Sequence, residues 1–331
     1  MTLLMRVYRA AVDSARQQLD FCPMSNSRQS THCATLAWWT LIALAACDRA
    51  GGARRQTDTT LPPSVGAVET VSAREPPRRW ESSAGTVLLI RDDSLTRAIY
   101  PTLTQLDSTA VLDEDLVRGF TAEAVAAEGA AGSLRIRGFA SIDEECAVWP
   151  AVVLSVDSAR SWTVAFQRGV ASPIVLHPIE SLPSVDSSRL AVQLTRLAAL
   201  LPNDTSRAFR GLPFVIRAAH RFTPTSGVEA VVAEVVRRVN VEANPREETL
   251  LVIAERAVPG SEWRVVYSER ASGDELHVQR ATPLAAVNLG PGRTPTVVIE
   301  RTGADWVTYA LLQRSAEGAW RQSWESAHSG C

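Results

Sequence analysis

From Gly85 onward the chain reads as short apolar runs separated by turn residues, and some of these runs have the alternating period of a β-strand. The clearest case is the segment 214–222, where five residues alternate with Arg217, Arg221 and others: Phe214, Ile216, Ala218, His220 and Phe222. Such alternation predicts a strand with one buried face. His220 on that face is interpreted as a hydrogen-bonded structural histidine and not as a ligand.

Similar short apolar runs occur at 86–93, 133–142 and 151–156, separated by turn residues. They predict a mainly β domain over residues 86–331. We expect antiparallel hairpins, arranged as a partial propeller or as a sandwich.

One segment has the period of a helix instead. Four leucines recur three or four residues apart: Leu190, Leu194, Leu197 and Leu201. This spacing places them on one face of an α-helix. Asp186 or Ser187 can cap its start, and Pro202 stops its end. We therefore expect one amphipathic helix near 187–201, with its leucines toward the core.

The apolar residues of the segment 227–256 fit both the period of an α-helix and that of a β-strand. Its valines are spaced as on a helix, and Ser226 with Glu229 imitates a capping box. Valine is β-branched, however, so it is stiff in a helix and favourable in a strand. We interpret the segment as a long hairpin that turns at 244–247.

Aromatic residues form a weak internal repeat. A strand and a short turn are followed by Trp and by a second ring four positions later: Trp162 with Phe166, Trp263 with Tyr267, and Trp320 with Trp324. Because four is an even number, both rings of a unit are expected on the same face of a strand. The repeat therefore supports the β interpretation.

The uncharged run 34–46 is too short for the about 20 apolar residues of a membrane-spanning helix. It has the length of a signal-peptide core, roughly 7–15 residues. It ends in Leu44-Ala45-Ala46-Cys47, which resembles the lipobox of bacterial lipoproteins. The resemblance implies that Cys47 becomes the N-terminus and carries acyl chains that anchor the protein. A buried helix or strand that ends in cysteine is the alternative.

The residues around this run complete the predicted organisation. A start at Met24 gives a short positively charged region before the core, so residues 1–23 are expected to be an over-extended N-terminus. A genuine amphipathic arm is the alternative for them. Residues 24–46 form the signal peptide, and the polar segment 47–85 forms a disordered tether. We expect a bacterial cell-envelope location, anchored to a membrane and facing the periplasm or the exterior.

Two cysteines besides Cys47 remain in the mature chain, Cys146 and Cys331. Exported compartments are oxidising, so these two are predicted to form a disulfide. Two separate thiols are the alternative.

The C-terminal stretch 285–331 is similar to the ends of exported proteins with degenerate FG-GAP or integrin-α-type propeller repeats. In that family an acidic loop binds calcium. The corresponding positions here are Asn288, Gly290, Gly292 and Thr296, which lack the carboxylates that calcium requires. The resemblance therefore implies a β-hairpin and no activity.

Composition excludes several functions. The net charge of −2 offers no attraction to nucleic acid. All 34 basic residues are arginine, so phosphate-binding loops, kinases and Schiff-base enzymes, which need lysine, are not present in their usual form. The histidines are scattered, and neither a metal site nor a cofactor is expected.

One dense polar cluster remains, Asp143, Glu144 and Glu145, followed by Cys146 and Trp149. It is interpreted as a solvated acidic turn or as a binding site that includes Trp149. We expect a non-catalytic binding or assembly module of the envelope, whose partner is an envelope protein or a glycan. The alternative is a glycosidase-like envelope hydrolase that uses the three carboxylates.

Overall fold

The computed structural model of the chain describes residues 87–92, 95–101, 118–140, 146–156, 161–202, 207–239, 245–257, 260–274 and 277–331. All of them belong to one structural unit, Thr70–Cys331. They form three antiparallel sheets and one α-helix, which confirms the predicted mainly β fold class. No helix in these ranges is long and apolar enough to cross a membrane. The predicted extension, signal peptide, lipidated Cys47 and tether lie outside the described residues.

The first sheet contains six strands, whose spatial order is β2 (Leu95–Ile99), β1 (Leu88–Asp92), β6 (Val164–Gln167), β3 (Thr121–Ala126), β4 (Gly129–Phe139) and β5 (Val152–Val156). An antiparallel bridge between Arg97 and Ala151 brings β2 to the residue before β5. The sheet therefore curls into a nearly closed barrel, and we call it the barrel sheet. Apolar side chains such as Leu89, Ile99 and Phe166 are buried in its core.

Two further sheets follow. The middle sheet has the order β16 (Trp320–Glu325), β15 (Trp306–Arg314), β14 (Thr294–Thr302), β13 (Arg280–Leu289) and β7 (Ala171–Ile174), and a short strand β17 (Ser329–Gly330) also pairs with β15. The outer sheet has the order β12 (Arg264–Asp274), β11 (Arg246–Ala257), β10 (Val228–Val239), β9 (Val215–Thr225) and β8 (His177–Pro178). Two 3-10 turns flank the helix, η3 (Ile179–Ser181) and η4 (Arg207–Phe209).

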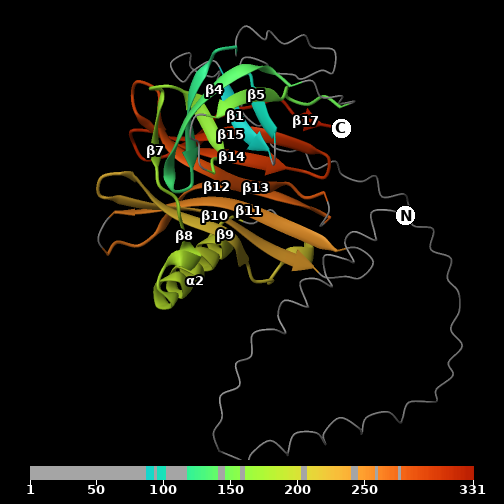
Figure 1. Cartoon of the computed structure of the whole chain (residues 1–331). Helices are drawn as coiled ribbons and strands as arrows, with labels where there is room; N and C mark the ends of the chain where they lie inside the picture. The colour runs from blue at the N-terminus through green and yellow to red at the C-terminus, as the bar shows by residue number, and fades with distance from the viewer. Residues whose placement is uncertain are drawn as a thin grey trace, which may run out of the picture. The chain divides into compact units, whose positions relative to one another are not determined.

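These elements stack in four layers, with the barrel sheet at one end and helix α2 (Ser184–Leu200) at the other (Figure 1). The middle sheet packs Val298 and Leu311 against the barrel core and Val297 and Leu312 against the outer sheet. Both of its faces are therefore buried. This explains why β14 and β15 read as continuous apolar runs and not as an alternating pattern.

The segment 227–256, whose pattern fitted both a helix and a strand, is a hairpin, as predicted. β10 and β11 pair along their whole length, from Val228 opposite Ala257 to Val239 opposite Arg246. The outer sheet contacts the middle sheet on one face and α2 on the other, so consecutive valines are all buried. Of the predicted turn, Asn244 lies outside the described residues, Pro245 precedes β11, and Arg246 and Glu247 already belong to β11. The hairpin expected around Gly290 is also present, as β13 and β14.

The helix is confirmed, but its start was predicted wrongly. It begins at Ser184 after Pro183, which provides no side-chain cap, and Asp186 lies within its first turn. An acidic residue there is favourable because the helix N-terminus carries partial positive charge. Leu190 and Leu194 are buried together with Ala198, whereas Leu197 and Leu201 lie at the edge of this face and pack partly buried against the same core.

Three β-bulges overturn predictions about faces. β9 has an extra residue at Arg217, so Ile216 packs toward α2 while Phe222 packs toward the middle sheet. Similar shifts separate Trp263 from Tyr267 and Trp320 from Trp324, which occupy different cores. One inserted residue exchanges the two faces of a strand. In the first unit, Trp162 and Phe166 do share one core, as predicted.

The predicted hydrogen bond of His220 is absent at one of its two ring nitrogens, among the described residues. Its ring is half buried, and its Nδ1 has no hydrogen-bond partner among the described residues. Burial lowers the pKa of His220 despite the nearby Glu180 carboxylate, because desolvation disfavours the charged ring. A neutral imidazole is therefore the form that this position stabilises.

Ion pairs connect the middle and outer sheets. Arg301 of β14 is 0% exposed and donates hydrogen bonds to Glu269 of β12 (2.6 Å) and to Glu325 of β16 (2.9 Å). Burial opposes its charge, but the two carboxylates prevail and raise the pKa of Arg301. On the same face Arg314 of β15 bonds Glu255 of β11 at 2.8 Å. Because two of these bonds run from one sheet to the other, they fix the position of each sheet against its neighbour.

Candidate binding pocket

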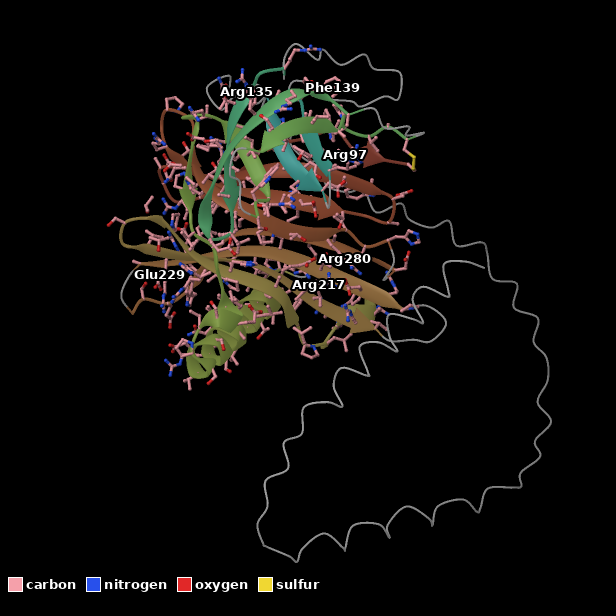
Figure 2. The ribbon with its side chains drawn as sticks, viewed as in Figure 1. Arg97, Arg135, Phe139, Arg217, Glu229 and Arg280 are labelled. Carbon is pink, nitrogen blue, oxygen red and sulfur yellow. A yellow bond between two sulfur atoms is a disulfide. The ribbon has the colours of Figure 1, made fainter. Side chains whose placement is uncertain are left out.

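The C-terminal strand β17 is held between two parts of the domain. Gly330 pairs with Trp306 of β15 on one side and forms a bridge with Ala147, near the start of β5, on the other. The next residue, Cys331, is disulfide-bonded to Cys146, in agreement with the prediction, with 4.8 Å between their Cα atoms. The sulfur atoms are visible in yellow in Figure 2, on the side of the domain where Arg97 lies and away from Arg217 of the outer sheet. We call β17 and this disulfide the C-terminal clamp.

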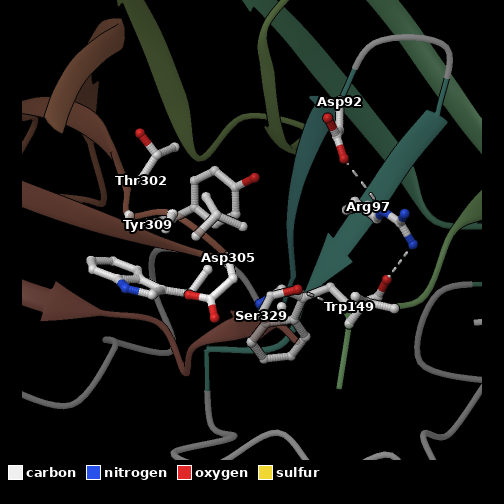
Figure 3. Close-up of a pocket in the computed structure, with 13 residues that line it drawn as sticks. Asp92, Arg97, Trp149, Thr302, Asp305, Tyr309 and Ser329 are labelled. Atoms are coloured by element: carbon white, nitrogen blue, oxygen red, sulfur yellow. Dashed lines mark hydrogen bonds and ion pairs between the residues drawn. The ribbon is translucent and has the colours of Figure 1, made fainter. Parts of the chain in front are cut away.

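A cavity of about 280 Å³ opens beside the clamp (Figure 3). Its walls come from four separate parts of the chain: β1 and β2 of the barrel sheet, the segment before β5, the β14–β15 turn, and β17. We call it the clamp pocket. The fold brings these parts together although the first and last are more than two hundred residues apart in the sequence.

Trp149 is one of the buried walls of the clamp pocket, with 1% of its surface exposed. Its ring stacks on Tyr100 at a centroid distance of 6.5 Å. Its backbone N–H donates to Ser329 Oγ at 3.2 Å, which ties the barrel side to β17. The indole Nε1–H is buried and has no hydrogen-bond partner among the described residues. Buried polar groups are almost always bonded, so this one marks a place for an acceptor.

Tyr309 of β15 forms a second buried wall, at 3% exposure. Burial raises its pKa, Glu300 and Asp92 raise it further, and Arg97 only partly compensates. The phenol therefore stays neutral at physiological pH. Figure 3 shows its hydroxyl turned toward Asp92 and Arg97, and the described residues supply no hydrogen bond to it. It remains able both to donate and to accept.

Charged side chains lie around these walls. Arg97 approaches Asp92 at 3.7 Å and donates to the Trp149 carbonyl oxygen at 2.9 Å, so its guanidinium is held by the protein itself. Asp305, in the β14–β15 turn, is exposed. Close by, burial and the Asp92 charge raise the pKa of Glu300. Carboxylates outnumber cations here, so the pocket is electronegative.

Trp306, at the start of β15, forms another wall of the clamp pocket and is held in place by its neighbours. Its ring stacks on His328 with centroids 5.0 Å apart and planes inclined by 15°. A Cβ atom at Gly303 would clash with the indole, so only glycine permits this packing. The turn Gly303–Asp305 therefore presents Trp306 and Asp305 in one defined arrangement.

The structure places only part of the predicted site. Trp149 lies in the pocket, whereas Asp143, Glu144 and Glu145 lie outside the described residues. The pocket also contains residues that the sequence did not reveal: Asp92, Arg97, Asp305, Trp306, Tyr309 and Ser329. The predicted disulfide was an available signal, because bonding Cys146 to Cys331 necessarily brings Trp149 near Ser329. Nothing in the local sequence connects either of them to β1 or β2.

The described ranges contain no group of three or more histidine, cysteine or acidic side chains positioned to hold a metal ion. The walls of the clamp pocket offer rings, hydroxyl groups and carboxylates, which are groups that bind organic ligands. In comparisons with known proteins, no family model, no curated protein and no solved structure matches the chain.

Proposed function

We propose that this chain is a cell-envelope lipoprotein whose β domain acts as a non-catalytic binding or assembly module. Lipid on Cys47 anchors it to a membrane, and its partner is a glycan or an envelope protein. The domain faces the periplasm or the exterior and engages its ligand at the clamp pocket.

The observation that carries this proposal is the set of hydrogen-bonding groups that have no protein partner beside the cavity. The Trp149 indole N–H is buried and has no hydrogen-bond partner in the described part of the chain. Tyr309 lines the same cavity, and its hydroxyl has no partner there either. Around them, Arg97 and Ser329 are already bonded to protein atoms. A neutral phenol with a raised pKa is a poor base and a poor nucleophile, so these groups favour binding over catalysis.

The disulfide supports the envelope location. Disulfides persist in oxidising compartments and are rare in reducing ones. Cys146–Cys331 ties the end of the chain to the barrel and borders the pocket. A pocket that lies beside such a bond is suited to an exported protein.

The anchor is tested by replacing Cys47 with alanine. In the producing bacterium, the unchanged protein should partition with membranes, and Cys47→Ala should lose that partitioning because it has no residue to acylate. Cys33→Ala is the matched control and should stay with membranes. Fractionation followed by intact-mass measurement checks both results. A Cys47→Ala protein that remains in the membrane fraction would refute the lipoprotein proposal.

The pocket is tested by filling its mouth. Ala304 is exposed at the rim of the cavity, so Ala304→Trp should block the entrance without disturbing the core. We expect the unchanged protein to retain envelope-derived small molecules or glycan fragments, and the variant to retain at least tenfold less. Val192→Trp on the far layer, where Val192 is 67% exposed, is the control for a new surface tryptophan. Equilibrium dialysis with mass spectrometry measures the retention, and equal retention by both variants would refute binding at the clamp pocket.

A further inference from the structure

We infer that the clamp pocket binds a neutral sugar ring. This inference rests on the proposed binding function and specifies the ligand class. It follows from the charge of the pocket, from the hydrogen-bonding groups that remain free in it, and from its rings and size.

The charge disfavours an anionic ligand. The charged side chains in the described walls are Asp92, Asp305 and Arg97. Their net charge is −1. Arg97, the one cation among the described wall residues, is engaged by Asp92 and by the Trp149 carbonyl. A phosphate or carboxylate entering the pocket would face Asp92 and Asp305 without a free partner of opposite charge.

The free hydrogen-bonding groups disfavour an organic cation. The Tyr309 hydroxyl can donate or accept, Asp305 only accepts, and the buried Trp149 indole only donates. An ammonium ion has donors and no acceptor, so it would leave the indole unbonded. A sugar hydroxyl both donates and accepts, and several of them on one ring can satisfy all three groups.

The rings and the volume agree with this ligand. Trp306 lines the cavity and is only partly buried, and an aromatic surface provides apolar contact for the C–H groups of a sugar ring. Stacking on His328 holds Trp306 in place before any ligand arrives, which reduces the entropic cost of binding. The cavity of about 280 Å³ lies just below the range for drug-sized ligand pockets, roughly 300–1,000 Å³. A monosaccharide or the end of a short glycan is the matching size.

The inference is tested by following the tryptophan indole N–H signals of the purified, ¹⁵N-tryptophan-labelled full chain by NMR. Trp149→Phe and Trp306→Phe assign the two pocket signals. The probes are glucose, galactose, mannose and N-acetylglucosamine, with choline as the cation and glucuronate as the anion. We expect at least one neutral sugar to shift the Trp149 signal saturably, while choline and glucuronate leave it unchanged.

Pocket variants then establish specificity. Tyr309→Phe and Asp305→Asn should each raise the Kd for that sugar about tenfold, the effect of losing one hydrogen bond. Glu262→Gln, an exposed carboxylate outside the pocket walls, should leave the Kd unchanged. Unchanged melting temperatures of the variants would confirm that the fold is intact.

The remaining outcomes separate the two proposals. If choline or glucuronate shifts the Trp149 signal and no neutral sugar does, the sugar inference is overturned and the pocket still binds a ligand. If none of the six probes shifts it, the sugar inference is overturned and retention by Ala304→Trp decides the proposed function. A sugar that binds equally well to Tyr309→Phe and Asp305→Asn also overturns the inference.

Discussion

Replacing Arg301 with methionine should lower the free energy of unfolding by about 3–5 kcal/mol, the cost of breaking a buried ion pair from one side. Arg301 is fully buried and bonds both Glu269 and Glu325. Removing it takes away the guanidinium that both carboxylates share in this largely buried layer. Denaturant unfolding of the variant at neutral pH measures the loss.

The same variant should have a distinctive pH dependence. Without Arg301, burial raises the folded-state pKa of the two carboxylates above their unfolded values. The folded state then binds protons more tightly than the unfolded state, so stability should rise as the pH falls toward those raised pKa values. The unchanged protein should show no such recovery at this site, because its carboxylates are bonded to Arg301.

Two controls test whether the loss of the Arg301 charge causes the lower stability. Arg321→Met removes an exposed arginine on β16 and should change stability by less than about 0.5 kcal/mol. The triple variant Arg301→Met, Glu269→Leu, Glu325→Leu should regain most of the loss, because apolar replacement of a whole buried ion cluster is often neutral. A triple variant as unstable as Arg301→Met would contradict this explanation.

Removing the disulfide should also have a large effect. Cys146 and Cys331 are 185 residues apart in the sequence, and the bond restricts the unfolded chain over that whole loop. The chain-entropy estimate for a loop of this length is about 5 kcal/mol, and measured values are often smaller. Chemical unfolding of a Cys146→Ser, Cys331→Ser variant, compared with the oxidised protein, measures the difference.

The structural consequence should be local as well as global. β17 pairs only through two residues with β15 and through one bridge with Ala147, so without the bond it should detach readily. Amide hydrogen exchange at Gly330 and Cys331 should then speed up, and binding at the clamp pocket should weaken. The oxidised protein treated with a reductant should behave like the double variant. Unchanged exchange in the double variant would show that β17 stays in place without the disulfide.

Local sequence patterns were sufficient for the type of most elements. The alternation at 214–222, the leucine spacing at 190–201 and the valine-rich hairpin each yielded the correct strand or helix. These patterns are informative because the conformation of the backbone sets which neighbouring side chains share a face, and one face is usually buried. Boundaries were less well determined, since the helix starts at Ser184 after a proline that offers no side-chain cap.

The candidate site was only partly predictable. Trp149 and the disulfide emerged from the cysteine count and from the cluster around Cys146. Asp92, Arg97 and Tyr309 did not, because each belongs to a strand whose position in the pocket depends on how the barrel sheet packs on the middle sheet. Such packing is a property of contacts between distant segments, and a single sequence carries no local sign of it.

By itself, the sequence was enough to predict antiparallel strands with one helix and to favour a disulfide between Cys146 and Cys331 over two separate thiols. Only the tertiary structure decided which face of each strand is buried, because single inserted residues in β9, β12 and β16 exchange those faces. A bulge leaves the composition of a strand unchanged, yet it reverses the direction of every side chain beyond it. These exchanges of strand faces allow the three sheets to pack on one another. The clamp pocket lies where the barrel sheet and the middle sheet meet.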